Sequence, residues 1–141
     1  MDQATRNQLL QAWGGVPPEC RSAPATEDEI AVFEGAWGPI PPDFRWFLLA
    51  CGGGPCGAEW VDGIKELWAS HAKFRAESHP GGWTMQGVFI IGWDGGGNPF
   101  GIDLATGAVV VEDHDFGGTH VMAESFEEFL RNGLDAGKQA S

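Results

Sequence analysis

The stretch that decides the fold is IGWDGGGNPFGIDLATGAVVVEDHDFGG, residues 91–118. It contains a triple glycine, two short apolar runs, a Thr-Gly pair and an Asp-His-Asp run. Gly, Asn and Asp suit the tight turns of hairpins, whereas short valine-rich runs are typical of strands. The stretch therefore predicts a β-meander, in which short antiparallel strands are joined by glycine-rich turns.

Helices are expected on both sides of this meander. Thr26 with Glu29, and Ser125 with Glu128, have capping-box spacing, in which the two side chains satisfy backbone amides at a helix start. Pro42 suits the first position of a helix, because the amide hydrogen that it lacks would have no partner there. Helices are expected to begin near residues 2, 26, 42, 64 and 125, and strands to cover 59–62, 88–93, 100–104, 108–112 and 119–122.

This order of elements predicts an α+β fold with a central, mainly antiparallel sheet packed by flanking helices. A length of 141 residues suits a single domain over residues 1–141. Trp68 continues the apolar spacing of its helix, so we expect it in the core. With 43% hydrophobic residues, seven Trp and nine Phe, the chain can fill a core without disulfides or a structural metal.

The cysteines and the hydrophobic runs bear on the compartment. Cys20, Cys51 and Cys56 are odd in number and match no zinc or redox spacing, so we interpret them as buried, reduced thiols. The first residues have no apolar run of signal-peptide length, and none elsewhere approaches a membrane span. We expect a soluble, cytoplasmic protein without a cofactor.

The charge is strongly acidic and unevenly distributed. A net charge of -12 and a pI of about 4.5 disfavour nucleic acids and anionic membranes as partners and favour a basic protein. Between Ala76 and Leu130 there is no Lys or Arg. The stretch is either a solvated acidic face or a partner-binding face. Its acidic residues are Glu77, Asp94, Asp103, Glu112, Asp113, Asp115, Glu124, Glu127 and Glu128.

Two loops carry residues that could hold a ligand. The run 94–98, DGGGN, could cradle a phosphate, but it lacks the Lys-Ser or Lys-Thr pair of a P-loop and lies between two strands. A hairpin turn is the favoured interpretation. Asp113, His114 and Asp115 could bind a metal with Asp103 or His120, yet neighbouring side chains of an extended chain point to opposite faces. Carboxylates bonded to nearby backbone amides are favoured there.

A hydrolase would need a nucleophile, a base and an orienting group. Cys51 or Cys56 with His71 or His79 is the only combination of nucleophile and base that the composition offers. Both cysteines are better interpreted as thiols without a catalytic function. We therefore assign no catalytic and no metal-binding residue from the sequence.

Taken together, these elements resemble the SUKH superfamily, specifically its Smi/Knr branch. The resemblance covers roughly residues 26–130, whereas 56–87 match the family less well. The motifs that carry it are EI and FE within 29–34, IPPDFRWFLL at 40–49 with GGG at 52–54, IGWDGGGN at 91–98, GAVV at 107–110, DHD at 113–115 and AESFEEFL at 123–130.

The resemblance implies a non-enzymatic interaction protein. In bacteria it implies an immunity protein that binds a cognate polymorphic toxin and blocks it. The acidic charge favours a toxin with a basic cleft, such as a nuclease. The alternatives are a scaffold or regulatory domain without a toxin and, from another class, a small metal-dependent hydrolase. Either a monomer or a homodimer is expected. The residues that we expect to contact a basic partner are Glu77, Glu112, Asp113, Asp115, Trp60 and Trp83.

Overall fold

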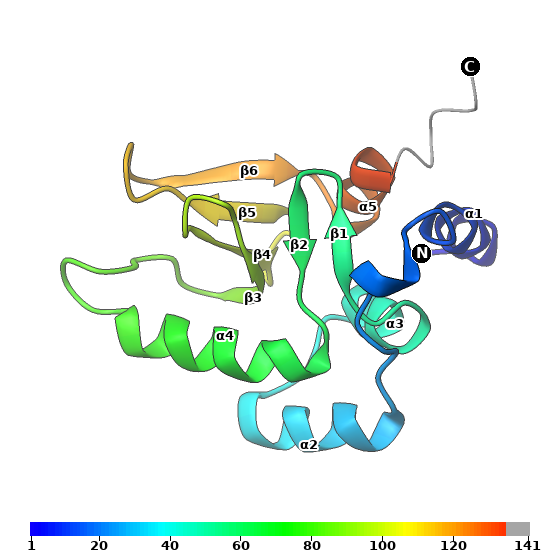
Figure 1. Ribbon diagram of the computed structural model, residues 1–141. Coiled ribbons are helices and arrows are strands. Elements are labelled where there is room, and N and C mark those ends of the chain that lie inside the picture. Colours follow the sequence, from blue (N-terminus) through cyan, green and yellow to red (C-terminus); the bar gives the residue numbers. More distant parts are fainter. Residues whose placement is uncertain (135–141) are drawn as a thin grey trace.

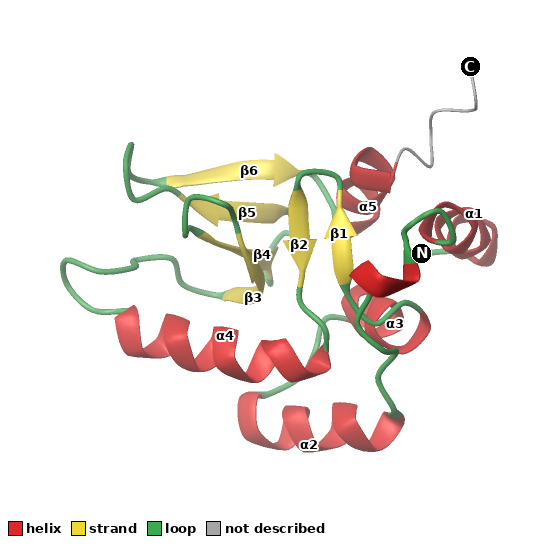
Figure 2. Ribbon diagram, viewed as in Figure 1, coloured by secondary structure: helices red, strands yellow, loops and turns green. Residues whose placement is uncertain are grey.

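A four-stranded antiparallel sheet organises the molecule (Figures 1 and 2). The computed structural model describes residues 1–134. Its strands lie in the order β3, β4, β5, β6, as the meander predicted. They are β3 (Val88–Trp93), β4 (Pro99–Asp103), β5 (Val109–Glu112) and β6 (Thr119–Ala123).

A short antiparallel hairpin forms a separate two-stranded sheet beside β3. It consists of β1 (Gly54–Cys56) and β2 (Glu59–Val61). The amide of Asp62, just after β2, donates to the carbonyl of Ile91 in β3 at 2.8 Å. Ile91 has no paired residue in β4, because the β3–β4 register shifts between Ile90 and Gly92. The bulge therefore lies beside the point where the hairpin docks.

Five α-helices and one 3-10 helix within residues 1–134 surround the strands. The second α-helix begins with the expected capping box, in which Glu29 N donates to Thr26 Oγ1 at 3.1 Å and Thr26 N donates to Glu29 Oε1 at 2.9 Å. In Figure 1, α2 and α4 run along one side of the strands, and α3 and α5 lie near the β1–β2 hairpin. The helices are α1 (Gln3–Trp13), η1 (Pro18–Cys20), α2 (Glu27–Trp37), α3 (Pro42–Ala50), α4 (Ile64–Glu77) and α5 (Phe126–Leu134).

The main core is an aromatic cluster between the helices and one face of the sheet. Phe44 in α3 is fully buried, and its ring centroid lies 5.5 Å from that of Phe126 in α5 and 5.8 Å from that of Phe89 in β3. Phe33 of α2 joins the cluster through Phe89. Burying each such side chain contributes about 1.5–3 kcal/mol to the stability of the fold, so this cluster is the main source of attraction between the helices and the sheet.

The opposite face of the sheet has a smaller apolar cluster. Met85, Ile90 and Val110 are buried together, and Phe74 of α4 packs against them. Met85 belongs to the loop between α4 and β3. That loop therefore folds over the second face of the sheet, which is the side on which the pocket described below is formed.

Two expectations about local structure were wrong. Trp68 has 38% of its surface exposed, because only its edge packs against Phe33. Strand β1 was expected to be a loop, since the glycines before it suggested only a helix end; its pairing with β2 makes it a strand.

Asp62 is a buried carboxylate at the junction of β2 and α4. It has 7% of its surface exposed, and its carboxylate accepts a hydrogen bond from the Ser70 hydroxyl. Burial is the main cause that raises its pKa from 3.8 to about 6. The folded protein therefore holds this proton more tightly than the unfolded chain. Stability from this group is greatest near pH 4 and is lost as the pH rises through about 6.

The Asp62→Asn variant should therefore be more stable than the parent protein at pH 7.5. Asparagine keeps an acceptor for Ser70 and removes the buried charge, so we expect a gain of roughly 1–3 kcal/mol, from about 1.4 kcal/mol per unit of pKa. Urea unfolding at pH 7.5 and at pH 4.5 measures it, with Asp103→Asn as a matched control in a half-exposed turn. Equal gains at both pH values would contradict the assignment.

Candidate functional site

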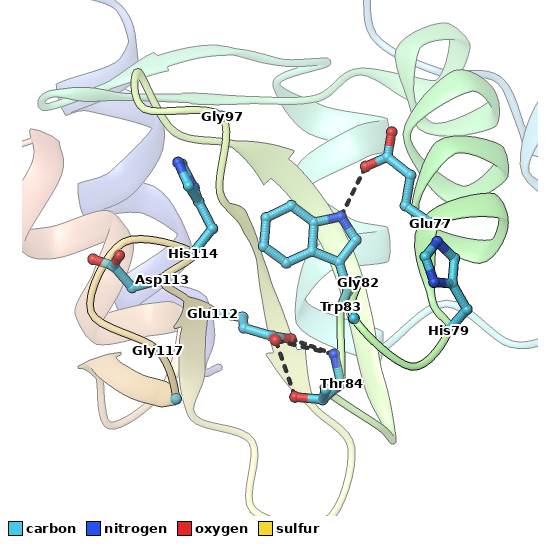
Figure 3. Close-up of a pocket in the computed structure, with 12 residues that line it drawn as sticks. Glu77, His79, Gly82, Trp83, Thr84, Gly97, Glu112, Asp113, His114 and Gly117 are labelled. Carbon is cyan, nitrogen blue, oxygen red and sulfur yellow. Dashed lines mark hydrogen bonds between the residues drawn. The ribbon is translucent and has the colours of Figure 1, made fainter.

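A pocket of about 690 Å³ opens beside the second face of the sheet. Its walls come from the loop between α4 and β3, the β3–β4 turn and the β5–β6 loop (Figure 3). The elements that contribute are far apart in sequence, since Glu77 ends α4 and Gly118 precedes β6. The pocket is therefore a product of tertiary structure.

The indole ring of Trp83 forms one wall. Its Nε1 donates to Glu77 Oε1 at 2.8 Å, which fixes the ring against the end of α4. The ring of Trp93 supports it, with centroids 5.9 Å apart. Lys73 Nζ lies 4.1 Å from the Trp93 ring centroid and 4.0 Å from Glu77 Oε2. Trp83 is thus held rigidly, with one end hydrogen-bonded.

His114 faces Trp83 across the pocket, with ring centroids 6.2 Å apart (Figure 3). The buried side chain of Asn98 anchors it, because the Asn98 Oδ1 accepts from the backbone amide of His114 at 2.9 Å and from its ring Nδ1. The other ring nitrogen, Nε2, lies 3.2 Å from Asp115 Oδ1. The glycine-rich turn before Asn98 thereby positions the histidine.

The β5–β6 loop is stabilised from within by Asp113. Its Oδ1 accepts from the amides of Asp115 at 2.8 Å and Phe116 at 3.0 Å, and these hydrogen bonds hold the pKa of Asp113 below its usual value. Gly117 and Gly118 have φ angles of 76° and 79°, which side-chain-bearing residues rarely adopt. The loop presents Phe116 to solvent with 89% of its surface exposed.

Glu112 forms part of the pocket lining and ties two segments together. Only 6% of its surface is exposed. Its carboxylate accepts from Thr84 N at 2.9 Å, Thr84 Oγ1 at 3.0 Å and Met85 N at 2.8 Å (Figure 3). These bonds fasten the loop between α4 and β3 onto β5. The carboxylate is therefore a structural support, and its expected contact with a partner stays a prediction.

The carboxylates that line this pocket have no Lys or Arg side chain among the other lining residues. They belong to Glu77, Glu112 and Asp113. Within residues 1–134, the ion pairs place a Lys or Arg beside only one of these three, Lys73 at Glu77. A surface of this kind favours cations and repels phosphates.

The structure brings together four of the six residues expected from sequence. Glu77, Trp83, Glu112 and Asp113 line the pocket, and Asp115 contacts it through His114. Trp60 lies on β2, does not line the pocket and is 45% exposed. Whether any of them binds a partner stays a prediction.

Sequence reasoning passed over Phe116. The sequence does contain a signal for its exposure, because Phe116 lies between Asp115 and two glycines. Such a segment is typical of a loop, and an aromatic side chain on a loop outside the core is exposed to solvent.

The other candidate sites have structural explanations. Asp94 Oδ1 accepts from Gly96 N at 2.9 Å and Asn98 N at 2.8 Å, and Gly97 has a φ of 83°, so the 94–98 run is the expected hairpin turn. Asp113 binds backbone amides, as favoured above. Among the residues that the structure describes, no group of three His, Cys, Asp or Glu side chains could hold a metal ion.

The cysteines do not have the character of nucleophiles. Cys51 and Cys56 are buried, and burial raises the pKa of each thiol to about 12. Both thiols therefore stay protonated at neutral pH, whereas a catalytic cysteine acts as a thiolate. All three cysteines are free in residues 1–134, and no helix there is long and apolar enough to span a bilayer.

Comparison with protein families settles the relationship. Residues 24–132 match the SMI1/KNR4 family, also called SUKH-1. The chain belongs to this family. The resemblance inferred from the motifs between 26 and 130 is thereby confirmed, and the match includes every residue that lines the pocket. No significant match was found among curated proteins.

Replacing Glu112 by alanine should destabilise the SUKH-1 domain and release the loop over the pocket. The change leaves the amides of Thr84 and Met85 without an acceptor, so we expect a loss of roughly 2–4 kcal/mol of unfolding free energy. Urea unfolding measures the loss, and hydrogen exchange at the two amides locates it. Glu124→Ala, at an exposed glutamate, is the control. Unchanged protection of both amides would refute the role given to Glu112.

Proposed function

We propose that this SUKH-1 protein is a non-enzymatic immunity protein that binds a cognate bacterial polymorphic toxin in the cytoplasm. The observation that carries the proposal is the acidic pocket, together with the exposed Phe116 of the loop that forms one of its walls. Binding there would cover a basic surface of the toxin and exclude its substrate. A nuclease is the toxin class that fits best, because its substrate channel must attract phosphates.

Electrostatics supports a basic partner. The stretch from Ala76 to Leu130 has no basic residue and contributes all three carboxylates of the pocket. Like-signed charges at one surface repel one another until an oppositely charged partner covers them. Complementary charge also accelerates the encounter and disfavours wrong partners. Asp115, with 73% of its side chain exposed, is the carboxylate best placed for a first contact.

Phe116 supports a protein rather than a small cation as the partner. An aromatic ring with 89% exposure at a loop tip contributes nothing to the core. Aromatic side chains become interface hot spots when they enter a pocket of the partner, and polar or charged residues commonly surround them. The combination of an exposed ring and an acidic pocket suits a specific interface.

Two other functions are less well supported. A scaffold without a toxin would use the same surface and differs only in its partner, so the product of the neighbouring gene distinguishes them. A metal-dependent hydrolase has no candidate metal group in the described part of the chain, and its buried thiols are protonated. The proposal therefore favours a binding protein that acts as a monomer or a homodimer.

Reversing the charge of Asp115 should weaken the complex with the product of the adjacent toxin gene. We expect Asp115→Lys to lower the affinity about tenfold at low salt, mainly by slowing association. Co-purification and rescue of growth during co-expression, followed by stopped-flow kinetics, measure the effect. The control is Glu19→Lys, the same charge at an exposed site in η1. Equal effects of both variants would remove Asp115 from the interface.

Removing the ring of Phe116 should weaken the same complex without lowering stability. Because the side chain makes almost no intramolecular contact, we expect Phe116→Ala to leave the melting temperature unchanged and to lower the affinity by about tenfold or more. Calorimetric titration with the purified toxin domain measures it. Val32→Ala, at an exposed valine of α2, controls for the loss of surface apolar area. Full affinity of the Phe116 variant would exclude it as an anchor.

A further inference from the structure

We propose that the pocket lined by Trp83, Glu112 and Asp113 receives an arginine side chain of the partner protein. The inference rests on the proposed function for the identity of that partner. The preference for a guanidinium comes from three features of the pocket. They are a fixed aromatic face, a buried carboxylate without a counter-ion, and a loop geometry that leaves the cavity open.

The aromatic face belongs to Trp83. The hydrogen bond to Glu77 and the contact with Trp93 orient the indole before any ligand arrives, so little side-chain entropy remains to be lost. The protein already uses the neighbouring indole in this way, since Lys73 Nζ lies 4.1 Å from the Trp93 ring centroid. Trp83 has no such cation of its own among the contacts of residues 1–134.

The buried charge belongs to Glu112. With 6% exposure it is surrounded by protein, and its hydrogen-bond donors are the neutral amides and hydroxyl of Thr84 and Met85. No ion pair within residues 1–134 includes it. Placing a carboxylate in such a site costs free energy that a nearby cation offsets. A cation in the pocket would therefore meet an uncompensated charge.

Arginine fits these features better than lysine or a metal ion. Its planar guanidinium can stack on an indole while its N–H groups reach carboxylates, whereas an ammonium is compact and strongly hydrated. Here the stacking surface is Trp83. The carboxylates of Glu112 and Asp113 both line the pocket; Glu112 lies beside the indole, and Asp113 is turned toward its own loop (Figure 3). The cavity of about 690 Å³ also leaves space for the main chain of a partner loop. A metal would need converging ligands, which the described residues do not provide.

The direct probe is N-acetyl-arginine amide, with N-acetyl-citrulline amide as its neutral isostere. Titration of the isotope-labelled protein is followed by NMR at the indole Nε1–H signals, and Trp83→Phe assigns the signal of Trp83. We expect a saturable shift of that signal with the arginine probe and at most a marginal shift with the citrulline probe. Equal shifts with both probes, or a saturable shift confined to another tryptophan, would overturn the inference.

Two matched substitutions test the role of charge. Asp113→Asn removes one carboxylate of the pocket and retains an acceptor for the loop amides, so the fold is preserved. We expect it to weaken binding of the arginine probe about three- to tenfold. Asp103→Asn makes the same change in a turn outside the pocket, where Asp103 accepts from Ala105 N at 2.9 Å, and should leave binding unaltered. If both variants bind like the parent protein, the pocket carboxylate has no part in recognition.

The same measurements separate this inference from the proposed function. If the toxin co-purifies with the chain but the arginine probe does not bind, the immunity function is supported and the arginine pocket is refuted. If the probe binds and no toxin does, the pocket is a guanidinium site and the proposed immunity function is refuted. When both bind, the arginine probe should compete with the toxin, and failure to compete would place the toxin elsewhere on the surface.

Discussion

The packing of phenylalanine rings between the helices and the sheet is the constraint on which the rest of the molecule depends. Phe44 is its centre, because its ring contacts those of Phe47 in α3, Phe89 in β3 and Phe126 in α5. Dispersion and apolar burial are not directional, so rings of this size can join elements that meet at different angles. Once this layer is fixed, one face of the sheet is occupied and the other remains for function.

The candidate site is then built on that second face by polar contacts. Glu112 fastens the loop after α4 to β5, and Asn98 fastens His114 to the turn after β3. Each is a buried polar group whose hydrogen bonds are satisfied by a segment distant in sequence. Such bonds are strong when the water is excluded and costly when broken, so they give the pocket one defined shape. The acidic character of the site and its rigidity thus come from the same residues.

The sequence predicted the fold well because its signals are local. Thr26 with Glu29 begins a helix, Pro42 begins another, and Gly97 and Gly107 have the positive φ angles of hairpin turns. Trp68 was wrongly expected in the core because it shares the helical spacing of the apolar residues. That spacing identifies the apolar face of a helix, but it does not show which residues lie at the border of that face and remain exposed. Strand β1 was not predicted because three residues give no period, and only pairing with β2 creates it.

The candidate site was predicted in part. The long run without basic residues located Glu77, Asp113 and Asp115 on one acidic surface, and their family was evident from ordered motifs. By itself, then, the sequence determined most of the helices and strands, the family and the sign of the charge. Each of these depends on short-range residue spacing or on composition. Only the tertiary structure decided that Glu112 is buried as a support and that Trp83 and His114 face one another. Their positions depend on contacts between segments about thirty residues apart, and those contacts form only when the loop after α4 folds over the sheet.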